Sequence, residues 1–329
     1  MRMLTRLVGA ASACLVLTSG AAAAPSKTYV LWLGTRVFVT ADTHSWHNVT
    51  PRGAVIPGTT RAIDGVQFRG PQGWLLSSDC TSGKGWLYRT DDRARSWRRY
   101  PFHAHSCAAG ANFYLDVLTA MRAWVVQNEP TGPFLRLYRT TNGGRSWRVV
   151  RELAEYGKVA FVSPDKGWLG GVHLFRTVDG GRTWHVQSLQ APRGYRRRLA
   201  LLTAPRFFGR TGVLAGQYQG AKPVIAFYRT GDGGRHWRLL GTEPGSAPGF
   251  FPQFTLTAVS ASVAWLLTAG DKPFAYVTRD GGRHWSAHAL PTRLYAPVVV
   301  SARVAAASDF HGRPFITRDG GTTWRPLNL

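Results

Sequence analysis

The chain has 329 residues, of which 44% are hydrophobic, so it can bury a sizeable core in one large repeat-built domain or in two ordinary domains. Lys and Arg total 41 against 17 Asp and Glu, which gives a formal net charge of +24 at pH 7. This imbalance says little about the fold. It argues against cationic partners and favours acidic polysaccharides, anionic lipid headgroups or nucleic acids.

The N-terminus has the layout of a secretory signal peptide. Arg2 and Arg6 precede an apolar run, and a stretch of alanines follows at 21–24. We expect cleavage near Ala23 or Ala24, so that residues 1–24 are removed and 25–329 form the mature protein. The alternative is an uncleaved anchor, because residues 7–24 nearly suffice to span a bilayer. No other segment is long and apolar enough to do so, and we expect no membrane span in the mature chain.

Two cysteines remain after processing, Cys80 and Cys107. In an exported chain two cysteines most simply form a disulfide, and the alternative is a pair of free buried thiols. His103 and His105 stand beside Cys107 and share one side if the chain is extended. No third ligand is evident, so we predict no metal site and read this segment as an exposed basic loop that could contact a partner.

A phrase of nine or ten residues recurs seven times. It reads YRTTNGGRSW at 138–147, FRTVDGGRTW at 175–184 and YRTGDGGRHW at 228–237, with shorter copies VTRDGGRHW at 277–285 and ITRDGGTTW at 316–324. Weaker copies are FVTADTHSW at 38–46 and YRTDDRARSW at 88–97. The acidic or amide position holds Asp42, Asp92, Asn142, Asp179, Asp232, Asp280 and Asp319. The last position holds Trp46, Trp97, Trp147, Trp184, Trp237, Trp285 and Trp324. Their spacing of 37 to 53 residues is the length of one four-stranded propeller blade.

Each repeat contains the strands of such a blade in chain order. A short apolar segment comes first, followed by a second strand such as GWLLS at 73–77 or AWLLT at 264–268. A third strand ends in Arg-Thr, and the phrase then leads through a tight turn into a strand that opens on Trp. We therefore predict an all-β, seven-bladed β-propeller formed by one domain.

The composition of the turn has structural reasons. The Asp or Asn can accept hydrogen bonds from backbone N–H groups one and two residues on, as in an Asx turn. The two glycines supply backbone angles that residues with a Cβ resist. The Trp can cover the hairpin and fill the space between blades. None of these roles needs a substrate, so we predict that the phrase is scaffold.

The phrase resembles the Asp-box of the BNR repeat, which occurs in sialidases, sortilin-like receptors, some glucanases and the photosystem II assembly-factor propellers. The combination of a GW strand, Arg-Thr and Asp-Gly-Gly-Arg-x-Trp looks most like the last group. The resemblance implies the propeller fold over residues 28–329. It implies no single function, because such propellers include enzymes, receptors and assembly factors. Nothing in the residues indicates chlorophyll or a photosystem.

Two departures from the pattern stand out. The second copy has Arg93-Ala94 in place of the two glycines, and the first copy lacks one residue. The first blade also lacks an obvious inner strand. That strand could come from residues 25–28 or from residues 53–57, or the blade could have three strands. The sequence leaves these alternatives open.

A glycoside hydrolase is the main alternative to a binding protein. A sialidase would need a Tyr–Glu pair and an Asp acid, and the chain has only Glu129, Glu152, Glu155 and Glu243. A glucanase would need two separated carboxylates. Several aspartates outside the boxes lie in expected turns, where a structural role suffices, and we predict no catalytic residue and no cofactor.

Arginines are the strongest indication of binding. A ring on the box-bearing face is predicted from a shared slot, which holds Arg95, Arg145, Arg182, Arg235 and Arg283. The Arg of Arg-Thr is expected to stack on neighbouring tryptophans, at Arg89, Arg139, Arg176 and Arg229. The opposite face should carry the candidate ligand loops, with Arg193, Tyr195, Arg196, Arg197, Arg198, Phe250 and Phe251. The alternative is a basic surface that only keeps the protein soluble.

The sequence thus predicts an exported, non-catalytic and monomeric propeller that acts as a docking or assembly scaffold. The expected partner is a protein or an acidic polymer of the cell envelope, since arginine suits bidentate contacts with carboxylates and phosphates. Specific nucleic-acid binding is not expected of an exported chain. A carbohydrate-active enzyme or lectin is the second hypothesis.

Overall fold

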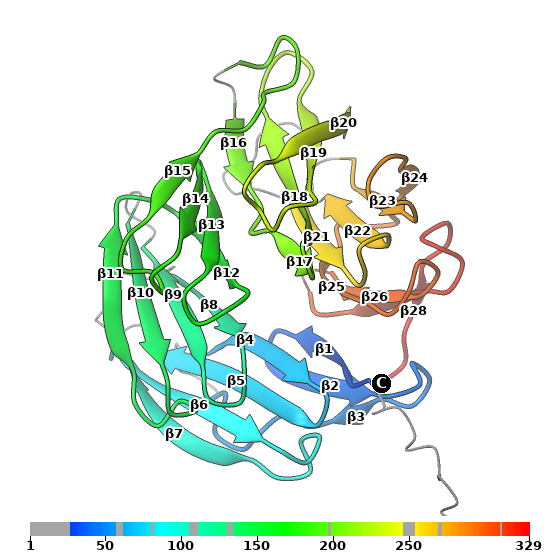
Figure 1. Cartoon of the computed structure of the whole chain (residues 1–329). Coiled ribbons are helices and arrows are strands. Elements are labelled where there is room, and N and C mark those ends of the chain that lie inside the picture. Colours follow the sequence, from blue (N-terminus) through cyan, green and yellow to red (C-terminus); the bar gives the residue numbers. More distant parts are fainter. Residues whose placement is uncertain are drawn as a thin grey trace, which may run out of the picture.

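In the computed structural model, seven antiparallel sheets stand around a common axis, as Figure 1 shows. The structure describes residues 27–56, 62–79, 82–104, 111–129, 134–196, 199–245, 254–268, 272–309 and 311–329. This arrangement confirms the seven-bladed β-propeller. Residues 1–24, Cys80, His105, Cys107, Arg197, Arg198, Phe250 and Phe251 lie outside the described residues, so the signal peptide and the disulfide stay predictions. No described residue belongs to a helix that could cross a membrane.

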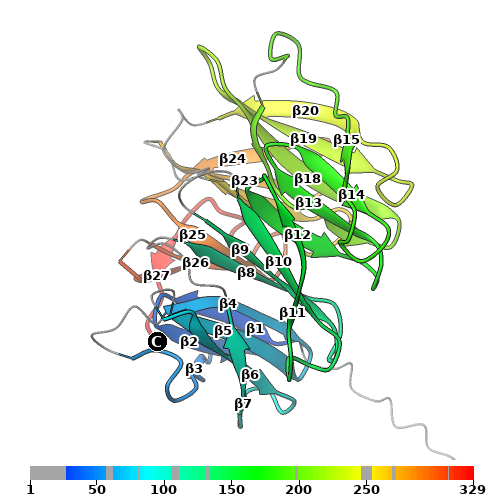
Figure 2. The same cartoon turned by 90° about the vertical axis from the view of Figure 1, so that its left-hand side faces the viewer.

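The first three blades follow the chain from its N-terminal end. The first contains β1 (Tyr29–Leu33), β2 (Arg36–Thr40) and β3 (His47–Asn48). The second contains β4 (Ala62–Arg69), β5 (Gln72–Asp79), β6 (Lys84–Thr90) and β7 (Arg98–His103). The third contains β8 (Asn112–Val117), β9 (Ala123–Asn128), β10 (Leu135–Thr140) and β11 (Arg148–Leu153). From the side, β11 lies on the outside of the ring (Figure 2).

The remaining four blades continue around the axis. The fourth contains β12 (Gly157–Phe161), β13 (Gly167–Gly171), β14 (Leu174–Thr177) and β15 (His185–Gln187). The fifth contains β16 (Leu199–Leu202), β17 (Arg206–Phe208), β18 (Thr211–Tyr218), β19 (Val224–Thr230) and β20 (Arg238–Pro244). The sixth contains β21 (Phe254–Ala258), β22 (Ala264–Thr268), β23 (Phe274–Thr278) and β24 (Ser286–Ala289). The seventh contains β25 (Tyr295–Val299), β26 (Ala305–Ser308), β27 (Pro314–Thr317) and β28 (Arg325–Pro326).

The inner edge of the fifth blade is broken into two strands. Both β16 and β17 pair with β18, and Pro205 separates them. Proline has no N–H and cannot continue the ladder, which explains the break. Arg206 therefore begins a new strand segment next to the axis of the ring.

Among the described residues the first blade has three strands, and the described parts of the two candidate segments supply no fourth. Residues 27–28 precede β1 without forming a strand, and residues 53–56 form a turn after β3. The strand β1 makes contacts with β25, β26 and β4, so it occupies the gap between the last blade and the second. The described part of the chain thus agrees with the three-stranded alternative.

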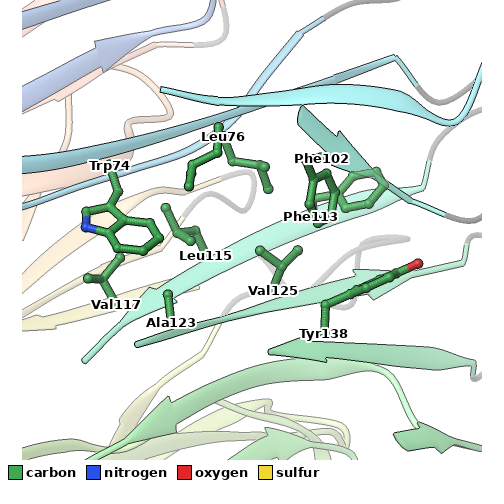
Figure 3. Close-up of a cluster of buried hydrophobic side chains, with 10 residues drawn as sticks. Trp74, Leu76, Phe102, Phe113, Leu115, Val117, Ala123, Val125 and Tyr138 are labelled. Atoms are coloured by element: carbon green, nitrogen blue, oxygen red, sulfur yellow. The ribbon is translucent and has the colours of Figure 1, made fainter. Parts of the chain in front are cut away.

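The core lies between neighbouring blades rather than at the axis. Figure 3 shows one cluster, in which Trp74 and Leu76 of the second blade face Leu115 and Val125 of the third. The second-strand tryptophans Trp74, Trp124, Trp168 and Trp265 are almost completely buried. Since each interface joins one blade to the next, burial of apolar surface stabilises the whole ring.

The tryptophans that end the boxes extend this packing, as expected. Trp285 of the sixth blade stacks on Phe227 of the fifth, with 4.0 Å between ring centroids. Trp324 meets Trp265 of the preceding blade edge-to-face at 6.2 Å. Each box tryptophan thus helps to join its blade to the one before it.

Candidate functional site

The box turns are closed by hydrogen bonds in which each aspartate accepts from a threonine hydroxyl and from backbone N–H groups. In the fifth blade, Thr230 Oγ1 donates to Asp232 Oδ1 at 2.7 Å and accepts from Gly234 N at 3.0 Å. Asp232 Oδ1 also accepts from the backbone N–H of Arg235 at 2.9 Å and of His236 at 3.1 Å. These donors lie three and four residues on, not one and two, so the predicted register of the Asx turn is wrong. The buried threonine is a second anchor that the sequence reasoning missed.

The same bonds set the charge state of these aspartates. The pKa of Asp232 is lowered well below its usual value, first by the backbone N–H of His236 and then by Thr230. Asp42 bonds to the N–H groups two and three residues on, because its box is one residue shorter. A carboxylate that accepts several backbone bonds stays ionised and is a poor general acid. The box aspartates are therefore structural.

The arginine of Arg-Thr joins successive blades. The guanidinium of Arg89 lies 4.8 Å from the ring centroid of Trp74, and Arg139 and Arg176 make similar contacts with Trp124 and Trp168. The predicted stacking is confirmed for these three, on tryptophans of the second strands. Arg89 Nη1 also donates to the carbonyl of Gly143 in the next blade, at 3.0 Å. These arginines thus have a structural use.

The boxes share one face of the ring with the turns between the first and second strands of the blades. The first box glycine donates its N–H to a carbonyl of that turn, as from Gly143 to Met121 and from Gly233 to Arg210. We call this side the box face and define it by its exposed cations. Those that follow the glycines or their counterparts are Arg95, Arg145, Arg182, Arg235 and Arg283, and those in the adjoining turns are Arg122, Lys166, Arg210 and Arg303.

Positive groups on the box face lie close enough to affect one another. The pKa of Arg139 is lowered by burial and then by the charges of Arg148, Arg182 and Arg122, while Asp165 opposes the shift. A hollow of about 300 Å³ lies between the fourth and fifth blades. Its lining includes Lys166, Arg176, Arg210 and Arg235, with Trp168 and Phe207 as apolar walls. Such a surface attracts carboxylates and phosphates.

The opposite side carries the predicted ligand loops, and we call it the loop face. Arg193 and Arg196 are exposed there. Tyr195 instead donates its hydroxyl hydrogen bond to the carbonyl of Lys222 and packs edge-on against Tyr218. It anchors the loop rather than extending toward a ligand. His103 is exposed at the end of β7, and the described residues contain no group of three or more His, Cys, Asp or Glu side chains placed to hold a metal ion.

The inner strands carry ionisable residues that the sequence reasoning did not single out as a site. Burial raises the pKa of Asp64 to about 7 and that of Asp116 to about 6. Asp116 accepts a bond from the N–H of Phe161 at 2.7 Å and so links the third and fourth blades. Lys158 lies over the ring of Tyr114, 4.2 Å from its centroid. Charged residues inside the predicted apolar segments are the signal that could have identified these positions.

The chain is similar to known proteins in part of its sequence and in its fold. Residues 150–311 match the family model described as photosynthesis system II assembly factor YCF48. No curated protein matches the chain. Among solved structures, YCF48 from Cyanidioschyzon merolae is 15% identical with a TM-score of 0.54, covering 83% of this chain and 87% of that one. YCF48 bound to a D1 peptide is 18% identical with a TM-score of 0.53, covering 90% and 92%.

An enzyme shares the same architecture. The GH74 xyloglucanase from Xanthomonas campestris is 16% identical with a TM-score of 0.59, covering 91% of this chain. The chain spans only 51% of that enzyme's length. Identities this low establish the fold alone. With its seven box turns, the chain is an Asp-box (BNR) repeat propeller, and its residues 150–311 are similar to the YCF48 photosystem II assembly-factor family.

Proposed function

We propose that the protein is an exported, monomeric docking scaffold that holds a protein partner of the cell envelope through acidic segments on the box face. The observation that supports this best is the group of exposed cations there, because the charges of Arg122 and Arg182 add to the effect of burial in lowering the pKa of Arg139. Bound carboxylates would relieve that repulsion and could take bidentate contacts from arginine. The similarity to YCF48, which has been solved with a D1 peptide, supports binding of a protein segment.

The competing location is the loop face, so the test compares the two faces at equal charge. One variant carries Arg122→Ser, Arg145→Ser and Arg182→Ser, and the other carries Arg193→Ser, Arg196→Ser and Lys222→Ser. All six side chains are exposed, and both variants lose three positive charges. Purified mature protein is used to capture partners from its own envelope extract at low and high salt, and the retained proteins are identified by mass spectrometry.

We expect a defined protein to be retained at both salt concentrations by the wild type and the loop-face variant, and to be lost from the box-face variant. Equal retention by the two variants would contradict docking on the box face. Retention of polyanionic material alone, released at high salt, would replace the protein partner by an acidic polymer, because exposed charges are screened by salt.

A glycoside hydrolase is the second candidate, and the carboxyl groups of the inner strands favour it. Asp64 has a pKa raised to about 7 by burial, a property that a general acid requires. Against this, Asp116 on the neighbouring inner strand is buried and bonded to the Phe161 N–H. A screen of fluorogenic sialosides and β-glucans tests the idea. Turnover that Asp64→Asn abolishes would establish the enzyme.

A further inference from the structure

The inner strands of the third, fourth and fifth blades bring two exposed cations near the axis of the ring. Lys158 belongs to β12, whose neighbours Gly157 and Val159 are buried while Lys158 itself is exposed. Arg206 opens β17 and is also exposed. Figure 1 places both strands on the inner side of their blades. Neither residue belongs to the box face or to the predicted ligand loops.

The two cations repel each other and lack a close counter-ion. Within the described part of the chain, no carboxylate lies within ion-pair distance of Lys158 or Arg206. Surrounding protein atoms and the charge of Arg206 lower the pKa of Lys158 to about 8. Asp116 interacts electrostatically with Arg206, but one of its carboxylate oxygens accepts a hydrogen bond from the N–H of Phe161. Folding therefore holds together two like charges that an anion could neutralise.

The surroundings can also hold an anion in place. Lys158 rests its ammonium on the face of Tyr114, which fixes the lysine side chain against the third blade. Tyr156 and Asn112 lie beside this pair, with 3.5 Å between the Asn112 amide nitrogen and the Tyr156 hydroxyl. Tyr156 also interacts with the Tyr114 hydroxyl, so amide and hydroxyl groups lie near the Lys158 ammonium.

The use of lysine at this position is itself informative. The chain relies on arginine for most of its positive charge and has few lysines, namely Lys27, Lys84, Lys158, Lys166, Lys222 and Lys272. An ammonium is a compact point charge with three rotatable donors, whereas a guanidinium is a planar fork. A lysine and an arginine together can donate hydrogen bonds to a small oxyanion from two directions.

We propose that Lys158 and Arg206 form an oxyanion site at the axis of the propeller, with Tyr114 as its wall. The ligand is a carboxylate or phosphate group of a small molecule or of a chain end that enters along the axis. This axial site is separate from the box face and does not depend on the proposed docking function.

The small number of lysines allows a direct test. The intact mature protein is acylated at pH 7 with a trace of an amine-reactive reagent, and the rate at each lysine is measured by peptide mass spectrometry. Inorganic phosphate and succinate are added in separate experiments, with sodium chloride at matched ionic strength as the reference. Lys84 and Lys272, which are exposed, serve as internal controls.

Only the neutral amine is acylated, so Lys158 should react fastest in the reference buffer. An anion that binds should raise its pKa and cover it, and one unit of pKa alone would slow the reaction about tenfold at pH 7. Arg206→Gln should abolish this protection, whereas Arg210→Gln, which removes an exposed arginine of the box face, should preserve it. Protection by phosphate but not by succinate, or the reverse, would identify the class of ligand.

Two results would overturn the proposal. In one, the Lys158 rate is the same in phosphate, succinate and sodium chloride. In the other, protection persists unchanged in Arg206→Gln, which would remove Arg206 from the site. Near-ultraviolet circular dichroism of each variant checks that its buried tryptophans keep their native environment.

Discussion

Aspartates of this chain differ in pKa according to what surrounds each carboxyl group. Asp319 is held to a pKa of about 2, first by the side chain of Thr323 and then by its N–H. Asp64 has a pKa of about 7, because burial on the inner strand β4 disfavours its ionised form and the opposing bonds to Ser78 are weaker. One of its carboxylate oxygens is buried without any hydrogen-bond partner. Asp64 is thus protonated under conditions in which the box aspartates are charged.

The pH dependence of stability should show this difference. In the unfolded chain Asp64 ionises near pH 3.8, whereas the folded protein keeps the proton until about pH 7. Its contribution to stability is therefore fully present below about pH 4 and is lost as the pH rises to about 7. We compare the free energy of unfolding of Asp64→Asn with that of the wild type at each pH. The difference in favour of the variant should be larger at pH 8 than at pH 4 by roughly 1–3 kcal/mol. Urea unfolding of both proteins at the two pH values measures this difference.

The matched control is Asp319→Asn, in which the lowered pKa predicts no such gain at pH 8. The box carboxylates contribute stability that is present above about pH 4 and is lost as the pH falls toward 2. An Asp64→Asn difference that stayed constant between pH 4 and pH 8 would mean that Asp64 is already ionised in the folded protein.

At the residue scale, the sequence predicted the box residues but not their bonding. The repeated phrase identified the position of Asp232, because seven copies share one spacing. The register of its bonds depends on how far the turn folds back, and local preference suggested donors that are too close in the chain. Lys158 and Arg206 come from two different blades and lie near each other only in the folded ring, so no local pattern could show them as a pair.

At the scale of the hairpin, the two box glycines have different reasons to be glycine. In the fifth blade, Gly233 has a φ of +73°, and an added Cβ would meet nothing within 4 Å. Gly234 has a φ of +77°, and its Cβ would lie 2.4 Å from the ring of Trp168 in the fourth blade. In this blade, Gly233 is required only by its positive φ. Gly234 is required by its positive φ and also by the close approach of the neighbouring blade.

These two glycines therefore form a matched pair for mutation. Gly233→Ala should cost about 1 kcal/mol, the strain of a left-handed residue with a Cβ. Gly234→Ala should cost about 2–5 kcal/mol, because displacement of Trp168 adds overpacking to the same strain. Thermal unfolding of the two variants measures the difference. Equal losses would show that the interface repacks around the methyl group at no cost.

The second blade offers the opposite change. Its box has Arg93 and Ala94 at these two positions, with φ of +60° and +67°. Arg93 is exposed and donates its N–H to the carbonyl of Pro71, a bond that glycine would keep. Arg93→Gly should therefore raise the free energy of unfolding by about 0.5–1 kcal/mol. Arg95→Gly, at an exposed neighbour without a positive φ, should bring no gain, and a similar rise in both variants would contradict the strain argument.

At the scale of the whole molecule, closure of the ring depends on side chains. Within residues 27–329, as far as the structure describes them, no sheet combines strands from the two ends, since β1 to β3 and β25 to β28 form separate blades. Leu31, Phe38 and Ile316 form an apolar cluster across the junction. Arg318 adds two hydrogen bonds to Thr43, at 3.0 Å to its hydroxyl and 2.8 Å to its carbonyl. Figure 1 shows the C-terminus beside β2 and β3.

The sequence could predict the number of blades but not how the ring closes. The seven boxes predict seven blades, and the strand patterns predict four strands in most of these blades. The sequence around the first blade does not show how its inner edge is completed. In the structure, β1 packs against β25 of the last blade and β4 of the second. The contacts of β1 with β25 join residues more than 260 positions apart, a separation that no local repeat pattern reveals.

The junction should be the first part of the ring to open, and Arg318 should control it. Arg318→Ala removes both bonds to Thr43 and should lower the free energy of opening by about 1 kcal/mol, with the apolar cluster left intact. Amide hydrogen exchange in β1 and β2 should then accelerate about fivefold, while β9 and β10 of the third blade keep their wild-type rates. Arg325→Ala is the control, because Arg325 is exposed on β28 and its side chain makes no hydrogen bond or ion pair with the described residues. Faster exchange throughout the ring would mean that the blades open together, and the first blade would then be held as firmly by packing alone as any four-stranded blade.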